Sequence, residues 1–185
     1  MRGRQPEAIS LYQEADTLFI DYSFKERLGE LYEMTGNKKE SDRIINEIIN
    51  SMSKDAERGE GEEGIGHYSD RELAYAFLLK NDYDKALKHA LTEYNRRPNN
   101  IDVNETVAWV YYNMGEYQKS IPFINAALKT NSKNPVLLSH AGMIYSKVNQ
   151  LDKAKILLQD ALRNDPFIDI QLKSEAKAVL NKLQS

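Results

Sequence analysis

The chain repeats itself at a spacing of 34 residues. Segments 67–100, 101–134 and 135–168 align with one another without a gap. Each segment contains two runs in which apolar residues recur every three and four positions, as they do on one face of an amphipathic helix. A polar turn separates the two runs, at Asn81-Asp82, Met114-Gly115 and Asn149-Gln150. A period of this length predicts stacked helix pairs in which each unit packs against its neighbours.

A fourth copy, with the same internal spacing, occupies residues 22–55. A small residue stands at the eighth place of every copy, where it allows the two helices to approach closely. These small residues are Gly29, Ala74, Ala108 and Gly142, and each is followed three places later by an aromatic residue, Tyr32, Phe77, Tyr111 or Tyr145.

These positions resemble the tetratricopeptide repeat, in which Leu-Gly, Tyr, Ala, Phe, Ala and Pro recur at defined places over 34 residues. Leu28-Gly29 and Tyr32 match that pattern most closely, although the first copy lacks the two alanines of the second helix. The resemblance covers about residues 22–168. It implies an all-α fold, a right-handed α-solenoid of antiparallel helix pairs, that acts as a protein-interaction scaffold and is no enzyme.

An insertion separates the first copy from the second. Residues 56–66 add 11 residues to the 34-residue spacing and are rich in Gly and Glu. We expect a solvated loop here. It is not expected to cradle a phosphate, because the carboxylates would repel the anion.

The two ends differ from the repeats. In residues 1–21, Ala8, Tyr12 and Ala15 have the spacing of a second helix without a first helix before it. Two interpretations remain open: a longer array is cut at Met1, or a lone helix caps the first repeat. Residues 169–185 predict a C-terminal capping helix with a polar outer side, which the end of a repeat stack requires.

Composition excludes several kinds of protein. There is no cysteine, and therefore no disulfide, thiol nucleophile or cysteine-ligated metal. The net charge of −3 argues against a general nucleic-acid-binding protein. No stretch approaches the roughly 18 apolar residues of a membrane span, and no apolar run typical of a secretory signal follows the first residues. We expect a soluble chain, whose compartment remains open.

The sequence contains no recognisable catalytic pattern. None of the three histidines lies in an H-E-x-x-H arrangement. His89 is expected on the solvated side of a second helix. Ser139 and His140 are adjacent in sequence, so on a helix they point about 100 degrees apart and do not form a nucleophile–base pair. We therefore predict no catalytic residue, no metal site and no cofactor.

The resemblance also implies a concave groove lined by the first helix of each copy. The residues at the groove places are the apolar candidates Tyr75, Trp109, Tyr112 and Met143, together with the polar candidates Arg71, His140, Glu26, Glu30, Glu72 and Glu105. Aromatic residues with a polar atom are typical anchors for peptides. Trp109 has two open interpretations: it anchors a ligand, or it packs between repeats and stiffens the wall.

Charge is distributed unevenly along the chain. Residues 1–66 hold 9 basic and 15 acidic side chains, whereas residues 67–185 hold 16 basic and 13 acidic ones. This favours a protein or peptide ligand with basic and apolar character. Two alternatives stay open: the repeats are the regulatory or docking part of a larger enzyme or envelope-associated protein, or the chain forms a homo-oligomer through its end helices.

Overall fold

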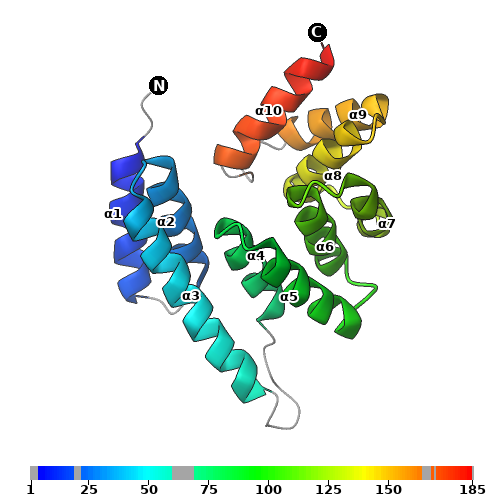
Figure 1. Ribbon diagram of the computed structural model, residues 1–185. Coiled ribbons are helices and arrows are strands. Elements are labelled where there is room, and N and C mark those ends of the chain that lie inside the picture. Colours follow the sequence, from blue (N-terminus) through cyan, green and yellow to red (C-terminus); the bar gives the residue numbers. More distant parts are fainter. Residues whose placement is uncertain (1–3, 19–21, 60–68, 164–167, 169, 185) are drawn as a thin grey trace. The chain divides into compact units, whose positions relative to one another are not determined.

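The computed structural model describes residues 4–18, 22–59, 69–163, 168 and 170–184, and all regular secondary structure in these ranges is α-helical (Figure 1). The first five helices are α1 (Gln5–Leu18), α2 (Tyr22–Met34), α3 (Lys38–Gly59), α4 (Asp70–Leu79) and α5 (Tyr83–Arg96). The other five are α6 (Ile101–Asn113), α7 (Tyr117–Leu128), α8 (Pro135–Lys147), α9 (Leu151–Arg163) and α10 (Ile170–Gln184).

The chain divides into two compact units, which we call the N-terminal unit, Met1–His89, and the C-terminal unit, Ala90–Ser185. The boundary falls within α5. Within the N-terminal unit α2 pairs with α3, and within the C-terminal unit α6 pairs with α7 and α8 with α9. These are the helix pairs that the 34-residue spacing predicts. The all-α prediction is therefore confirmed.

The turn inside each repeat has one geometry in all four copies. The residue at the fifteenth place has a positive φ: 79° at Gly36, 56° at Asn81, 78° at Gly115 and 60° at Asn149. In each case the next residue donates its N–H to the carbonyl of the aromatic residue five positions earlier, over 2.8 to 3.0 Å. This is the Schellman ending of a helix, which favours Gly or Asn because their side chains tolerate the left-handed region. The three turns that the sequence predicts, at Asn81-Asp82, Met114-Gly115 and Asn149-Gln150, lie at the predicted positions.

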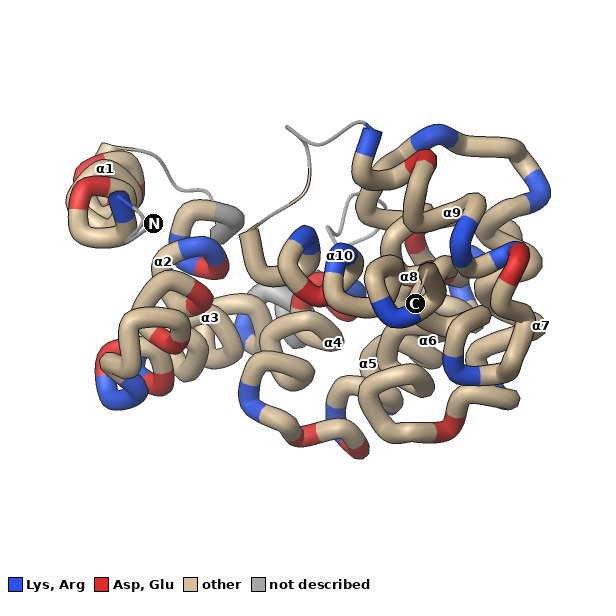
Figure 2. Tube along the Cα trace, turned by 90° about the horizontal axis from the view of Figure 1, so that it is seen from above, with Lys and Arg blue, Asp and Glu red and all other residues tan. Residues whose placement is uncertain are grey.

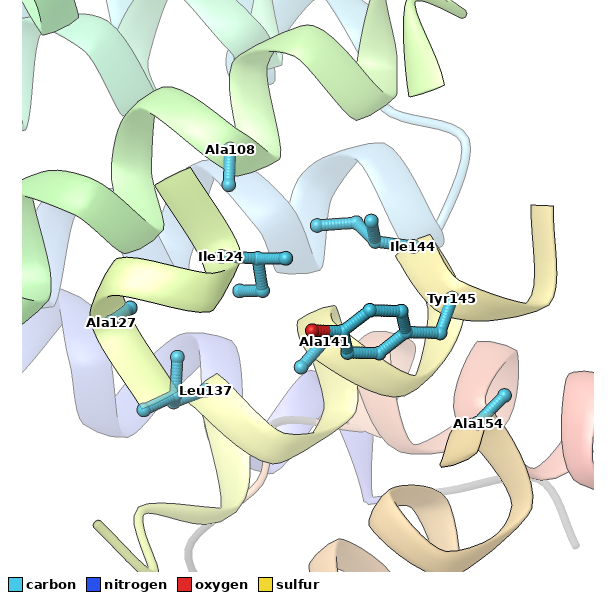
Figure 3. Packing of buried hydrophobic residues seen from close by; sticks show 8 residues of the cluster. All are labelled: Ala108, Ile124, Ala127, Leu137, Ala141, Ile144, Tyr145 and Ala154. Atoms are coloured by element: carbon cyan, nitrogen blue, oxygen red, sulfur yellow. The ribbon is translucent and has the colours of Figure 1, made fainter. Parts of the chain in front are cut away.

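Small residues bring the paired helices together in the C-terminal unit. A Cβ atom on Gly142 would lie 2.6 Å from Cγ of Leu158, so only glycine fits between α8 and α9 at this point. Figure 3 shows the adjoining core, where Ala108, Ile124, Ala127, Leu137, Ala141, Ile144, Tyr145 and Ala154 pack as one cluster. The eighth-place residues thus act as the sequence predicted, through close helix approach.

The core of the N-terminal unit lies between α2 and α3. Its buried side chains include Leu28, Leu31, Ile44, Ile45, Ile48 and Met52, which recur every three or four positions. Helix α3 is longer than the second helix of the other copies, and it continues through Gly59. Residues 56–59 are therefore helical, which corrects the prediction of a loop over 56–66. The remaining part of that insertion, 60–66, lies outside the described residues.

Both ends of the described chain are helical. Helix α1 packs against α2, and α10 packs against α8 and α9. In α10, Leu172 and Ala176 are buried, and they pack in a second cluster that contains Leu158 and Met143. No side chain of α1 is buried.

Candidate binding surfaces

The structure groups the predicted groove residues into two separate sets. Glu26, Glu30, Arg71, Glu72 and Tyr75 lie on α2 and α4 in the N-terminal unit, and Glu105, Trp109, Tyr112, His140 and Met143 lie on α6 and α8 in the C-terminal unit. We name the first set the acidic cluster and the second the aromatic cluster. Each is described by itself.

The acidic cluster brings carboxylates from two helices close enough to influence one another. The pKa of the Glu26 carboxyl is raised to about 7, mainly by burial and also by the negative charges of Glu30 on the same helix and Glu72 on α4. The positive charges of Arg27 and Arg71 act in the opposite direction. Near neutral pH the Glu26 carboxyl is therefore partly protonated.

Two arginines neutralise part of this cluster. Nη1 of Arg27 donates to Oε2 of Glu30 over 2.8 Å. Nη1 of Arg71 lies 3.9 Å from Oε1 of Glu72, and its guanidinium carbon lies 5.4 Å from the centre of the Tyr75 ring. The other carboxylate oxygen of Glu72, Oε2, is buried and has no hydrogen-bond partner among the described residues. Figure 2 marks the charged positions of α2 and α4. The cluster thus contains more acidic than basic groups. In addition, Oε2 of Glu72 accepts no hydrogen bond within the described part of the chain.

The polar members of the aromatic cluster are buried. Glu105 and His140 have relative exposures of only 5% and 4%, and Nδ1 of His140 is hydrogen-bonded to Oε1 of Glu105. Glu105 on α6 and His140 on α8 are therefore hydrogen-bonding partners for one another. The prediction that Glu105 and His140 face the groove as polar residues is corrected, because neither side chain is presented to solvent.

Trp109 lies in a stack of parallel rings. Its ring centre is 3.7 Å from that of His140 and 4.7 Å from that of Tyr112, with interplanar angles of 11° and 7°. Trp109 and Tyr112 are both half-buried. Burial raises the pKa of the Tyr112 hydroxyl to about 12. Trp109 thus packs between neighbouring first helices, as one of its two interpretations requires, while part of its surface remains accessible.

The prediction that Met143 lines the groove is corrected for the same reason as the predictions for Glu105 and His140. Its side chain is only 3% exposed, and it packs in one cluster with Leu172 and Ala176 of α10. The cause is α10, which packs on α8 and contributes side chains to the cluster around this groove place. Of the aromatic cluster, only Trp109 and Tyr112 remain accessible to a ligand.

The expectation that His89 is solvated is wrong. Nδ1 of His89 lies 2.6 Å from Oδ1 of Asp70, and the imidazole ring stacks on Phe77 at 5.4 Å. The stacking partner stands at the eleventh place of the same copy, where every copy has an aromatic residue. That regularity is present in the sequence and is the signal that could have found this contact.

A pocket in the C-terminal unit was not predicted. Its volume is about 370 Å³, and it is lined by Asn99, Asn100, Ile101, Asp102, Thr130, Ser132, Asn134 and Leu137. Asn100 and Asn134 cap α6 and α8, because their side-chain oxygens accept backbone N–H groups at the start of each helix. These asparagines are therefore explained by helix capping.

Metal-binding groups and membrane-spanning helices are both absent from the described part of the chain. It contains no group of three or more His, Asp or Glu side chains arranged to hold a metal ion. None of its helices combines the length and the apolar character required to cross a membrane.

Comparison with known proteins identifies the repeats. The model of the tetratricopeptide repeat matches residues 101–134 and 137–168. No curated protein matches the chain. Among solved structures, a thermophilic tetratricopeptide-repeat protein of Thermus thermophilus superposes with a TM-score of 0.61 at 19% identity, over 96% of this chain and 91% of that one.

Two other structures have the same fold. The first tetratricopeptide-repeat domain of the human RPAP3 protein superposes with a TM-score of 0.52 at 17% identity, over 63% of this chain and 91% of that one. A tetratricopeptide-repeat protein from Parabacteroides merdae gives 0.53 at 17% identity, over 88% of this chain and 60% of that one. At these identities the likeness concerns the fold alone.

Paired helices, four turns of one geometry and small residues at the helix contacts define a helical-repeat protein of the α-solenoid class. Residues 101–134 and 137–168 match the tetratricopeptide-repeat model, and the fold is that of the solved tetratricopeptide-repeat structures. Proteins of this family are generally interaction scaffolds that bind other proteins.

Proposed function

We propose that the chain is a non-enzymatic scaffold that binds a peptide or protein segment through a basic side chain, and that the acidic cluster on α2 and α4 receives this side chain. The observation that supports the proposal is the raised pKa of Glu26, to about 7, beside Glu30 and Glu72. Carboxylates that disfavour one another's ionisation are stabilised when a cation enters between them.

The buried Oε2 atom of Glu72 adds a hydrogen-bond acceptor to this charge. A Lys or Arg side chain of the ligand supplies the donor as well as the positive charge. Tyr75, half-buried and one turn further along α4, offers an apolar surface beside it. In the C-terminal unit the accessible surfaces of Trp109 and Tyr112 provide a separate apolar contact.

The proposal is tested by selecting ligands from a displayed library of random seven-residue peptides. We expect selected peptides to be enriched in Lys or Arg. Glu72→Gln should weaken their binding at least tenfold, because it removes a charge that the ligand would pair with. Asp84→Asn, at an exposed carboxylate on α5, is the matched control and should leave binding unchanged. Enrichment of acidic peptides, or equal effects of the two substitutions, would contradict the proposal.

The pH dependence gives a second, independent result. A bound cation favours the ionised form of Glu26, so binding releases a proton wherever Glu26 is protonated in the free protein. Affinity for a basic peptide should therefore rise between about pH 6 and pH 8, across the pKa of about 7. In Glu26→Gln this rise should be absent. Calorimetric titration at four pH values measures both the affinity and the proton release.

A further inference from the structure

Helix α1 presents an open face that the second helices of the repeats do not have. In α7, Ile124 packs with Leu137 of the following helix, and the preceding residue, Phe123, packs on Tyr111 of its own first helix. In α5, His89 stacks on Phe77 in the same way. In α1, Tyr12 contacts Phe24 of the following helix, but the preceding residue, Leu11, is 67% exposed. Among the described residues, nothing buries Leu11.

This open face is a regular stripe. Tyr12 and Asp16 face α2, where the Tyr12 ring lies 6.4 Å from that of Phe24 and Asp16 pairs with Lys25 at 3.3 Å. The opposite side of α1 presents Glu7, Leu11, Glu14 and Leu18, which are four, three and four positions apart and all exposed. The stripe therefore alternates acidic and large apolar residues along the whole length of the helix.

Helix α10 presents the complementary face. Leu172 and Ala176 point into the cluster shared with α8 and α9. On the other side Ile170 is 65% exposed, and Lys177, two turns further along, is exposed as well. An apolar residue and a lysine thus lie on the outer side of α10.

The net charges of α1 and α10 favour one of the three possible pairings of these helices. Helix α1 contains three acidic residues and no basic one, whereas α10 contains three lysines and one glutamate. Pairing α1 with a second α1 would oppose like charges, and so would pairing α10 with a second α10. Only α1 against α10 brings opposite charges together, and it also covers Leu11 and Ile170.

We propose that the chain self-associates head to tail, with the outer face of α10 in one copy packing on the Glu7–Leu18 stripe of α1 in a second copy. The contact is heterologous, so a dimer keeps one unused α1 face and one unused α10 face that can bind further copies. It involves no residue of the acidic or aromatic cluster, and it is therefore independent of the proposed peptide binding. A single helix pair is a small interface, so the association is weak.

Sedimentation velocity of the full chain tests the proposal, at concentrations from about 10 μM to about 1 mM, the range of weak complexes. We expect the average mass to rise with concentration past that of a dimer. We also expect the rise to diminish at high salt, because the contact contains opposed charges at the surface.

Two variants locate the contact. Leu11→Glu disables the α1 face and Lys177→Glu the α10 face, and each alone should raise the dissociation constant at least tenfold. Ile156→Glu is the matched control, since Ile156 of α9 is 60% exposed and lies outside both faces. It should associate like the parent chain. All three positions are exposed, and circular dichroism verifies that the variants are folded.

A mixture of the two variants identifies the geometry. The Leu11→Glu chain retains its α10 face and the Lys177→Glu chain retains its α1 face, so an equimolar mixture should form a one-to-one dimer and nothing larger. A parent chain that stays monomeric overturns the proposal. So does a mixture that remains monomeric, or association that Leu11→Glu and Ile156→Glu weaken equally.

Discussion

At the scale of single residues, the eighth place of the repeat shows how the same residue type can be required in one copy and dispensable in another. Gly142 is in contact with a buried leucine, because an added Cβ would lie 2.6 Å from Cγ of Leu158. At Gly29 the nearest atom to such a Cβ is Cγ1 of Ile45, at an ordinary 3.4 Å.

We therefore predict opposite outcomes for the same substitution. Gly142→Ala should lower the free energy of unfolding by about 1 to 3 kcal/mol, the usual cost of overpacking a core. Gly29→Ala should be neutral or stabilising by up to about 1 kcal/mol, since alanine favours the helix. Urea denaturation of both variants measures the difference, and equal losses would contradict the close contact at Gly142.

Two buried serines provide a second matched pair. The hydroxyl of Ser120 is fully buried and has no hydrogen-bond partner among the described residues. That of Ser139 is also buried, but it donates to the carbonyl of Pro135 over 2.8 Å. Ser120→Ala should raise the free energy of unfolding by about 1 kcal/mol, because an unsatisfied polar group is removed. Ser139→Ala should lower it by about the same amount. A loss at both positions would mean that Ser120 is satisfied by water.

Glu26 makes stability depend on pH. Its folded pKa of about 7 lies above the value of 4.5 for a free carboxyl. Its contribution to stability is therefore complete below about pH 4.5 and is lost as the pH rises through 7. Glu26→Gln, which cannot ionise, should raise the melting temperature at pH 8 and change it little at pH 4.5. A uniform shift at both pH values would show that a lost contact, and not ionisation, is responsible.

At the scale of elements, the turn between the two helices of a repeat is the feature that sequence predicted most completely. Its geometry depends on one backbone conformation, which Gly36, Asn81, Gly115 and Asn149 all adopt. Because Gly and Asn adopt a positive φ more readily than other residues, this backbone conformation can be recognised from the residue type at the fifteenth place.

The geometry of this turn predicts different effects on stability for two substitutions. Gly115→Ala should lower the free energy of unfolding by about 1 to 2 kcal/mol, because alanine is strained at the φ of 78°. Asn149→Gly should be neutral or slightly stabilising, since glycine removes the strain at 60°. Denaturation of both variants by urea provides the measurement, and tolerance of alanine at Gly115 would contradict the turn geometry.

The side chains of the candidate site were predicted less well, for a physical reason. The places on the first helices were assigned from the repeat pattern, which predicts the direction of a side chain relative to its own helix. Burial depends on neighbouring helices instead. Glu105 is buried because His140 of the next copy pairs with it, and Met143 is buried among side chains of α10. The end of α3 at Gly59 was placed a few residues too early, because glutamates beside glycine are compatible with a helix end as well as with a loop.

At the scale of the whole molecule, burial is distributed unevenly among the helices. Helix α8 has nine consecutive buried residues from Leu137 to Tyr145, whereas no residue of α1 is buried. Segments with few buried contacts open most readily. We expect backbone amides of α1 to exchange with solvent at least a hundredfold faster than those of α8, as measured by hydrogen–deuterium exchange. Equal protection of the two helices under dilute conditions would show that the stripe on α1 is covered.

The ring stack around Trp109 has a consequence for spectroscopy. Trp109 is the only tryptophan of the chain, and it lies in the C-terminal unit between His140 and Tyr112. Its emission is an intrinsic optical probe of that unit alone, whereas far-ultraviolet circular dichroism records the helices of both. Unfolding curves followed by the two signals in one sample therefore distinguish the melting of Ala90–Ser185 from that of Met1–His89 without any added label.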